Sequence, residues 1–155
     1  MKAEYINAFY LATQDVFRLM LDLETTRLAM RVTEELVPFR EANVVIGVTG
    51  DLAGSLLYSF PKNMALEMVR IMSGMEMTEL DAFVTSAMGE LANIISGNAM
   101  TRLFESNFRC DIVPPQILIG GGQSLSMATP QAIVLQLQTS IGAFEVSISL
   151  RTAKS

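Results

Sequence analysis

The chain has 155 residues, of which 50% are hydrophobic and 17% are charged, so it is not intrinsically disordered and can bury a substantial core. Its net charge is −5 and its basic residues are scattered, which excludes the concentrated positive charge that nucleic-acid binding requires. The absence of histidine excludes Ser-His and Cys-His catalysis, phosphohistidine chemistry and nearly all zinc sites.

The sequence shows no targeting or membrane-spanning segment and contains one cysteine. No uninterrupted apolar run approaches the ~18 residues of a membrane-spanning helix, and the N-terminus lacks the basic and apolar segments of a signal peptide. We therefore expect a cytoplasmic protein. The single cysteine, Cys110, cannot form an intrachain disulfide, and its place before a predicted strand favours a buried structural thiol over a nucleophile.

The first half of the chain predicts a helix, three strands and a second helix. Thr13 lies inside the apolar stripe of the first helix, where its hydroxyl can bond to the preceding turn. The first strand alternates, so we expect it to be half-buried with Leu28, Met30 and Val32 on one face. The predicted ranges are 3–22 (helix), 27–34, 43–49 and 55–60 (strands, with a loop around Pro38 and a tight turn over 50–54) and 62–73 (helix).

The second half predicts one long helix and three further strands. Thr78 and Asp81 resemble a capping box at the start of this helix, which we expect to run to about Asn107. Pro114 and Pro115 confine the first of these strands to a sheet edge or a bulge. The predicted strands cover 111–119, 133–138 and 144–151, with a flexible connection at the three glycines 120–122.

This order of elements predicts a single α+β domain over residues 1–155. We expect two similar halves of three strands each, with long helices packed on a largely antiparallel sheet. The helix over 62–73 carries a methionine stripe, which can serve as an adaptable binding surface. Core packing is the favoured interpretation of that stripe.

The middle of the long helix carries a narrow polar stripe. At ~100° per residue, Glu90, Asn93 and Gly97 fall within roughly 40° of Ser86, and Gly89 lies about 60° to one side. Small residues beside polar ones allow another molecule's backbone to approach. We expect the neighbouring arc of the helix to face the core, through Leu80, Phe83, Val84, Ala87, Leu91, Ile94 and Ile95.

Glu90 and Asn93 are three residues apart and can act on one incoming group. A carboxamide can orient a water molecule without titrating, and a carboxylate can accept a proton or hold a basic group. The pair suits a reaction limited by positioning water, such as acyl-phosphate hydrolysis, although on residue types alone a solvated helix face is the more common interpretation, in roughly four cases of five. Asn98 falls within the apolar arc and is interpreted as a structural amide, and one carboxylate is too few for a metal site.

The pattern Ser86-x-x-x-Glu90-x-x-Asn93, followed by Gly97-Asn98 and Pro114-Pro115, resembles the signature of the CheC/CheX/FliY phosphatases. The plan of the whole chain is most similar to the CheX branch of that family. This resemblance implies a CheC-like fold and a chemotaxis phosphatase that hydrolyses the phosphoaspartate of CheY-type response regulators in two-component signalling.

The same resemblance implies roles for individual residues. Asn93 would enter the regulator and orient the attacking water, Glu90 would engage the regulator's active-site lysine, and Ser86, Gly89 and Gly97 would bind the partner. The chain would need no cofactor of its own, because Mg²⁺ would belong to the regulator. A homodimer joined at the sheet edges is also implied, with no nucleic-acid or membrane partner.

Two departures and two alternatives accompany the resemblance. Glu4 and Asn7 echo the pair, but the matching serine position would precede Met1, so we expect one site per chain. Ala92 stands where family members often have glycine. The main alternative is a non-enzymatic CheC-like interaction domain of a signalling or flagellar switch complex, and another is a small-ligand sensor built around the methionines.

Overall fold

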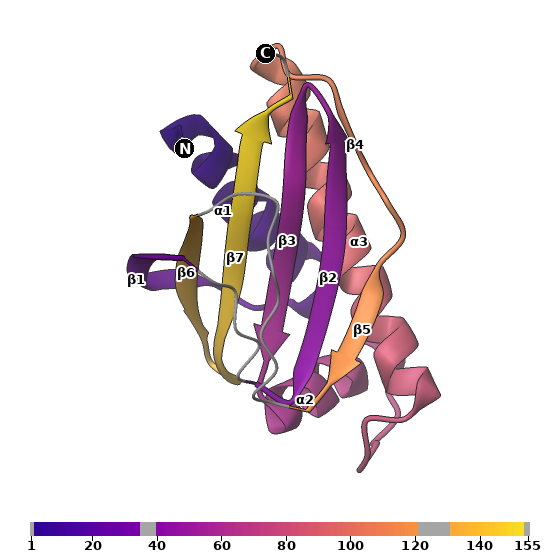
Figure 1. Cartoon of the computed structure of the whole chain (residues 1–155). Coiled ribbons are helices and arrows are strands. Elements are labelled where there is room, and N and C mark those ends of the chain that lie inside the picture. Colours follow the sequence, from indigo (N-terminus) through magenta and orange to yellow (C-terminus); the bar gives the residue numbers. More distant parts are fainter. Residues whose placement is uncertain (1, 35–39, 121–130, 154–155) are drawn as a thin grey trace.

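The computed structural model describes residues 2–34, 40–120 and 131–153, and within these ranges three α-helices cover one face of a seven-stranded antiparallel sheet (Figure 1). The strand order is β1-β6-β7-β3-β2-β4, and β5 also pairs with β2. The predicted α+β class is therefore confirmed. The elements are α1 (Ala3–Val16, continued by a π-helical turn Phe17–Leu21), β1 (Thr26–Thr33), β2 (Ala42–Gly50), β3 (Leu52–Phe60), α2 (Lys62–Ser73), α3 (Ala82–Glu105), β4 (Cys110–Ile112), β5 (Gln116–Ile119), β6 (Ala132–Thr139) and β7 (Gly142–Thr152).

The segment predicted as one strand over 111–119 is two short strands. β4 pairs with residues 48–50 of β2, and β5 pairs with residues 42–45 of the same strand. Between them Val113 still donates its N–H to the carbonyl of Gly47, over 3.0 Å. Pro114 and Pro115 have no N–H to donate, so the ladder is interrupted at this edge. Of the glycines predicted to follow, Gly121 and Gly122 lie outside the described residues, as does Pro38.

The core lies between the sheet and the helices. The ring of Phe144 on β7 stacks on Phe17 and Phe60, with centroid distances of 4.8 and 5.1 Å. Met64 and Met68 of α2 are buried in the same core, which confirms core packing for the methionine stripe. As predicted, the Thr13 hydroxyl donates to the carbonyl of Phe9, over 2.7 Å.

One buried polar pair joins α3 to the sheet. The hydroxyl groups of Tyr58 on β3 and Ser96 on α3 lie 2.7 Å apart, and both side chains are fully buried. Because an unpaired hydroxyl in the core is costly, this bond favours one rotation of α3 over the sheet. The polar stripe lies roughly 60–120° around α3 from Ser96.

Two predictions about α3 are wrong. Its N-cap is Asp81, whose carboxylate accepts the N–H of Val84 over 2.9 Å, and Thr78 lies outside the helix. Phe83 is not in the core, because its side chain is 44% exposed. The buried face instead runs through Val84, Met88, Leu91, Ala92, Ile95 and Ala99, because both the sheet and α1 pack on α3.

The prediction of a half-buried first strand is also wrong. Leu28, Met30 and Val32 on β1 are 54%, 51% and 60% exposed. β1 pairs only with β6, so it forms one edge of the sheet. Helix α1 reaches β1 where Arg27 lies over the ring of Tyr10, but it leaves these apolar side chains uncovered.

Candidate functional site

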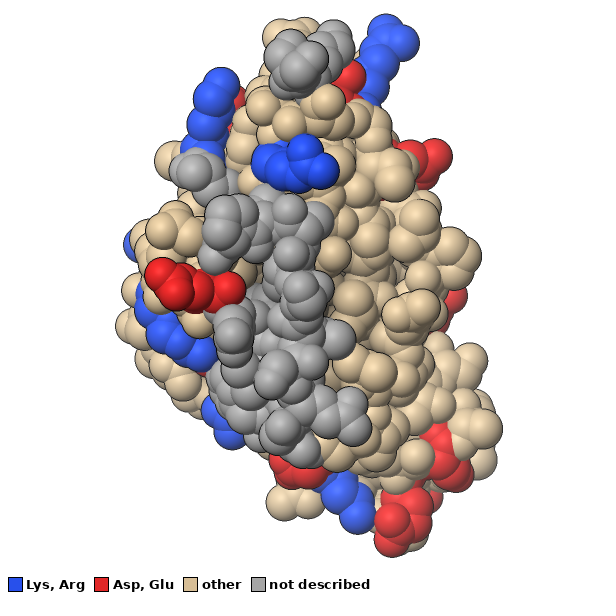
Figure 2. Space-filling model, in the orientation of Figure 1, with Lys and Arg blue, Asp and Glu red and all other residues tan. Residues whose placement is uncertain are grey.

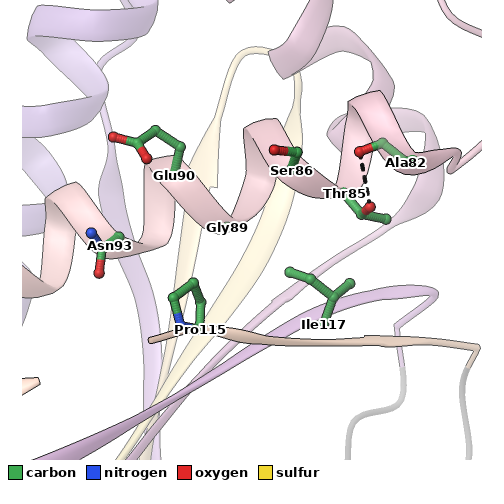
Figure 3. Close-up of a pocket in the computed structure, with 8 residues that line it drawn as sticks. All are labelled: Ala82, Thr85, Ser86, Gly89, Glu90, Asn93, Pro115 and Ile117. Carbon is green, nitrogen blue, oxygen red and sulfur yellow. Dashed lines mark hydrogen bonds between the residues drawn. The ribbon is translucent and has the colours of Figure 1, made fainter. Parts of the chain in front are cut away.

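A pocket of about 330 Å³ lies between the first half of α3 and the edge segment that leads into β5. Ser86, Gly89, Glu90 and Asn93 line it from the helix, so four of the five residues predicted for the site lie together (Figure 3). Ala82 and Thr85 complete the helical wall, and Pro115 and Ile117 form the opposite wall. The fifth residue, Gly97, does not line this pocket.

Two polar residues that line the pocket from α3, Glu90 and Asn93, are available to an incoming group. Within the described part of the chain, the side chains of Glu90 and Asn93 form no hydrogen bond or ion pair with another residue. Glu90 is exposed and Asn93 is half-buried. In Figure 3, Glu90 projects on the side of α3 away from Pro115, and Asn93 follows one turn later. The carboxamide of Asn93 and the carboxylate of Glu90 can therefore contact the same ligand from different sides.

The absence of a side chain at Gly89 determines how much space remains between α3 and the opposite wall of the pocket. A Cβ atom placed on Gly89 would lie 3.5 Å from both the Pro115 Cγ and the Ile117 Cδ1 atoms, which is ordinary van der Waals contact. Any larger side chain at this position would occupy the pocket. The missing side chain therefore keeps open the space between α3 and Pro115.

Asn98 is a structural amide, as the sequence predicts. Its Oδ1 accepts the Nε–H of Arg102 over 3.0 Å, and the guanidinium of Arg102 also pairs with Asp15 on α1. Asn98 thus helps to join α1 and α3. Its carboxamide is engaged within the chain, in contrast to that of Asn93.

Metal and thiol chemistry have little support in the described residues. Within those ranges, no three His, Cys, Asp or Glu side chains come together as a metal site would require. Cys110 is half-buried, less than predicted, and burial raises the pKa of its thiol. A raised pKa disfavours the thiolate, so this environment does not activate Cys110 as a nucleophile.

Sequence reasoning missed one wall of the pocket. In the sequence Pro115 is a strand breaker and part of the family signature, and no pattern identifies Ile117. Both residues face α3 because β5 pairs with β2 at the sheet edge, next to the helix. The sequence signal for this wall is the pair Pro114-Pro115. It predicts a sheet edge but does not identify the helix that lies beside that edge.

Comparisons with known proteins point to one family. The chain matches the family model for "Chemotaxis phosphatase CheX" over residues 42–138. A curated relative, the CheY-P phosphatase CheX of Thermotoga maritima, is 35% identical over 122 residues, which are 77% of this chain and 78% of the relative.

Solved structures share the whole fold. The chemotaxis protein CheX of Desulfovibrio desulfuricans matches with a TM-score of 0.86 at 28% identity, over 96% of this chain and 99% of that one. A chain of the CheX–CheY–BeF3–Mg²⁺ complex from Borrelia burgdorferi has the same fold, with a TM-score of 0.73 at 24% identity, over 95% of this chain and 97% of that one. Among the described residues, no helix is long and apolar enough to cross a membrane.

Proposed function

This chain belongs to the CheX family of chemotaxis phosphatases, and from that premise we propose that it hydrolyses the phosphoaspartate of a CheY-type response regulator at the α3 pocket. Water attacks phosphorus, the bond between phosphorus and the aspartate oxygen breaks, and inorganic phosphate and the free carboxylate are released. An acyl phosphate is already activated, so the reaction needs a positioned water more than a covalent intermediate.

Asn93 is the residue that orients this water in our proposal. Its carboxamide has one oxygen that can accept from water and one NH2 group that can donate to a phosphoryl oxygen. The observation that carries the proposal is that Asn93 and Glu90 line one pocket and are both without partners in the described residues. A preorganised amide that needs no rearrangement is suited to such a role.

Glu90 has a different role, because its carboxylate projects away from Pro115 and is exposed. We assign it to the regulator's active-site lysine, which it holds through a charge-assisted hydrogen bond. Ser86 and Gly89 keep the approach to Asn93 narrow but open. Mg²⁺ belongs to the regulator in this scheme, and the reaction takes place in the cytoplasm.

The test follows the decay of the phosphorylated CheY-type regulator of the same organism, with Mg²⁺, in the presence of each variant. The wild-type protein accelerates the decay, and Asn93→Ala removes roughly 10²-fold or more of the acceleration. Asn98→Ala is the matched control, because it truncates another half-buried asparagine on the same helix and leaves the acceleration within about twofold of wild type. Circular dichroism establishes that both variants are folded.

Two outcomes would overturn the proposal. One is a folded Asn93→Ala variant with wild-type activity. The other is a wild-type protein that leaves the regulator's lifetime unchanged, which would favour the interaction-domain alternative. A Glu90→Gln variant distinguishes a docking role of Glu90 from a role in the chemical step. Loss of a docking carboxylate should raise KM more than it lowers kcat.

We also propose that the protein is a homodimer joined through β1. Among the described strands β1 pairs on one side only, with β6, and its Leu28, Met30 and Val32 side chains are exposed. An exposed apolar edge strand is a template for pairing with a second copy. Light scattering should give a dimer for wild type and a monomer for Val32→Lys, whereas Phe104→Lys, near β4 at the other edge, stays dimeric. A wild-type monomer at about 50 µM, well above the micromolar Kd range of a specific interface, would refute this interface.

A further inference from the structure

Phe83 is an exposed aromatic side chain of α3. It is 44% exposed and has no aromatic or cation–π contact with a described residue. The other exposed phenylalanine of α3, Phe104, lies under the guanidinium of Arg109, at 5.6 Å from the ring centroid. Phe83 has no such partner, so its exposure is not explained by the fold.

Phe83 lies on the same side of α3 as the proposed catalytic pair. Seven residues separate it from Glu90, which is almost two full turns, so the two side chains lie nearly in line along the helix. The distance along the axis is about 10 Å. A protein that reaches Asn93 past Glu90 is therefore in a position to cover Phe83 as well.

The charges around Phe83 restrict the kind of surface that can cover it. No lysine or arginine occurs between Arg70 and Arg102, whereas Glu76, Glu79, Asp81 and Glu90 lie in that interval. Of these, Glu79 pairs with Lys62 over 3.3 Å and Asp81 caps α3. Figure 2 shows acidic side chains gathered at the lower right, at the end of the molecule where Figure 1 places the connection between α2 and α3. A complementary surface combines an apolar contact with flanking basic groups.

We propose that Phe83 is the docking contact that selects the regulator, an inference that rests on the proposed function of the Glu90–Asn93 pocket. Its ring packs on an apolar side chain of the regulator that lies about 15 Å along α3 from Asn93, and lysine or arginine residues of the regulator flank that contact. Aromatic residues at the centre or border of an interface often contribute a large part of its binding energy. Phe83 thus acts in binding, and Asn93 acts in the chemical step.

The experiment compares Phe83→Ala, Phe83→Leu and Phe104→Ala in two assays. In the phosphoregulator decay assay, Phe83→Ala should raise KM roughly tenfold with kcat within about twofold of wild type, as expected for an interface anchor. Phe83→Leu keeps an apolar contact and should restore most of the affinity. Phe104→Ala is the matched control on the same helix and should leave KM unchanged. Thermal unfolding of Phe83→Ala should stay close to that of wild type, because the side chain is 44% exposed.

The second assay measures binding of the beryllofluoride-activated regulator to Asn93→Ala with and without Phe83→Ala, so that docking is measured without catalysis. The added substitution should weaken Kd roughly tenfold. An unchanged Kd and KM, a loss in kcat alone, or an equal loss in Phe104→Ala would overturn the inference. If wild type binds the regulator through Phe83 but does not accelerate its dephosphorylation, the docking role stands and the proposed function fails. If it does not bind, both fail.

Discussion

Replacing Gly89 with alanine should separate the stability of α3 from access to its pocket. The new Cβ lies 3.5 Å from Pro115 Cγ and Ile117 Cδ1, so it fits without displacing either residue. Alanine in a helix is favoured over glycine by about 0.5–1 kcal/mol. Covering the added methyl group contributes up to about 0.8 kcal/mol more. Gly89→Ala should therefore raise the free energy of unfolding by about 1–1.5 kcal/mol.

Gly97→Ala provides the stability reference. A Cβ atom at Gly97 meets no other heavy atom within 4 Å, so only the helix term of about 0.5–1 kcal/mol applies. In a domain of this size each 1 kcal/mol corresponds to about 2–4 °C in Tm. Urea titration and thermal unfolding should thus rank Gly89→Ala above Gly97→Ala, and both above wild type.

The same methyl group at Gly89 takes up space that the regulator needs beside Asn93. We expect kcat/KM for dephosphorylation to fall about tenfold, which corresponds to about 1.4 kcal/mol, mainly through KM. A Gly89→Ala variant less stable than wild type would refute the clearance derived from the structure. A stable variant with full activity would refute the use of this pocket in docking.

Two further predictions concern the core and the thiol. Tyr58→Phe leaves the Ser96 hydroxyl buried without a partner and should lower the free energy of unfolding by about 1–3 kcal/mol, measured with urea. Adding Ser96→Ala should recover most of this loss, and a double variant as unstable as the single one would contradict the pairing. Because burial raises the pKa of Cys110, its thiolate fraction at pH 8 is below that of a free cysteine. Iodoacetamide should therefore alkylate the native protein more slowly than the unfolded one, and a faster native reaction would contradict that environment.

Periodicity along the chain predicted the elements and much of the pocket. The alternation that marks β6 and β7 is local, and so is the spacing that places Ser86, Glu90 and Asn93 on one side of a helix. Each of these patterns needs only the geometry of its own element. The structure accordingly contains the hairpin and brings the three residues to one pocket, while their roles in catalysis stay predictions.

The errors concern residues whose surroundings come from distant parts of the chain. The angular position of Phe83 around the helix predicts a core residue. That position does not show which parts of the α3 surface are covered by α1 and by the sheet, and the side chain of Phe83 is exposed. Alternation in β1 predicted a buried face, but burial depends on whether a helix covers that face, and β1 lies at the edge. Pro115 and Ile117 reach the pocket only through the pairing of β5 with β2. Tertiary arrangement, which local patterns do not contain, decides all of these positions.

The two edges of the sheet differ in a way that limits the size of any assembly. β1 offers eight residues of continuous backbone, whereas the other edge is divided into strands of three and four residues by a pair of prolines. Fibres grow when both edges of a sheet accept new strands. If two copies pair through β1 as we propose, strand addition would use up that edge in a symmetric pair and would end there. Pro115, which lines the pocket, and its neighbour Pro114 would in that case also limit open-ended polymerisation.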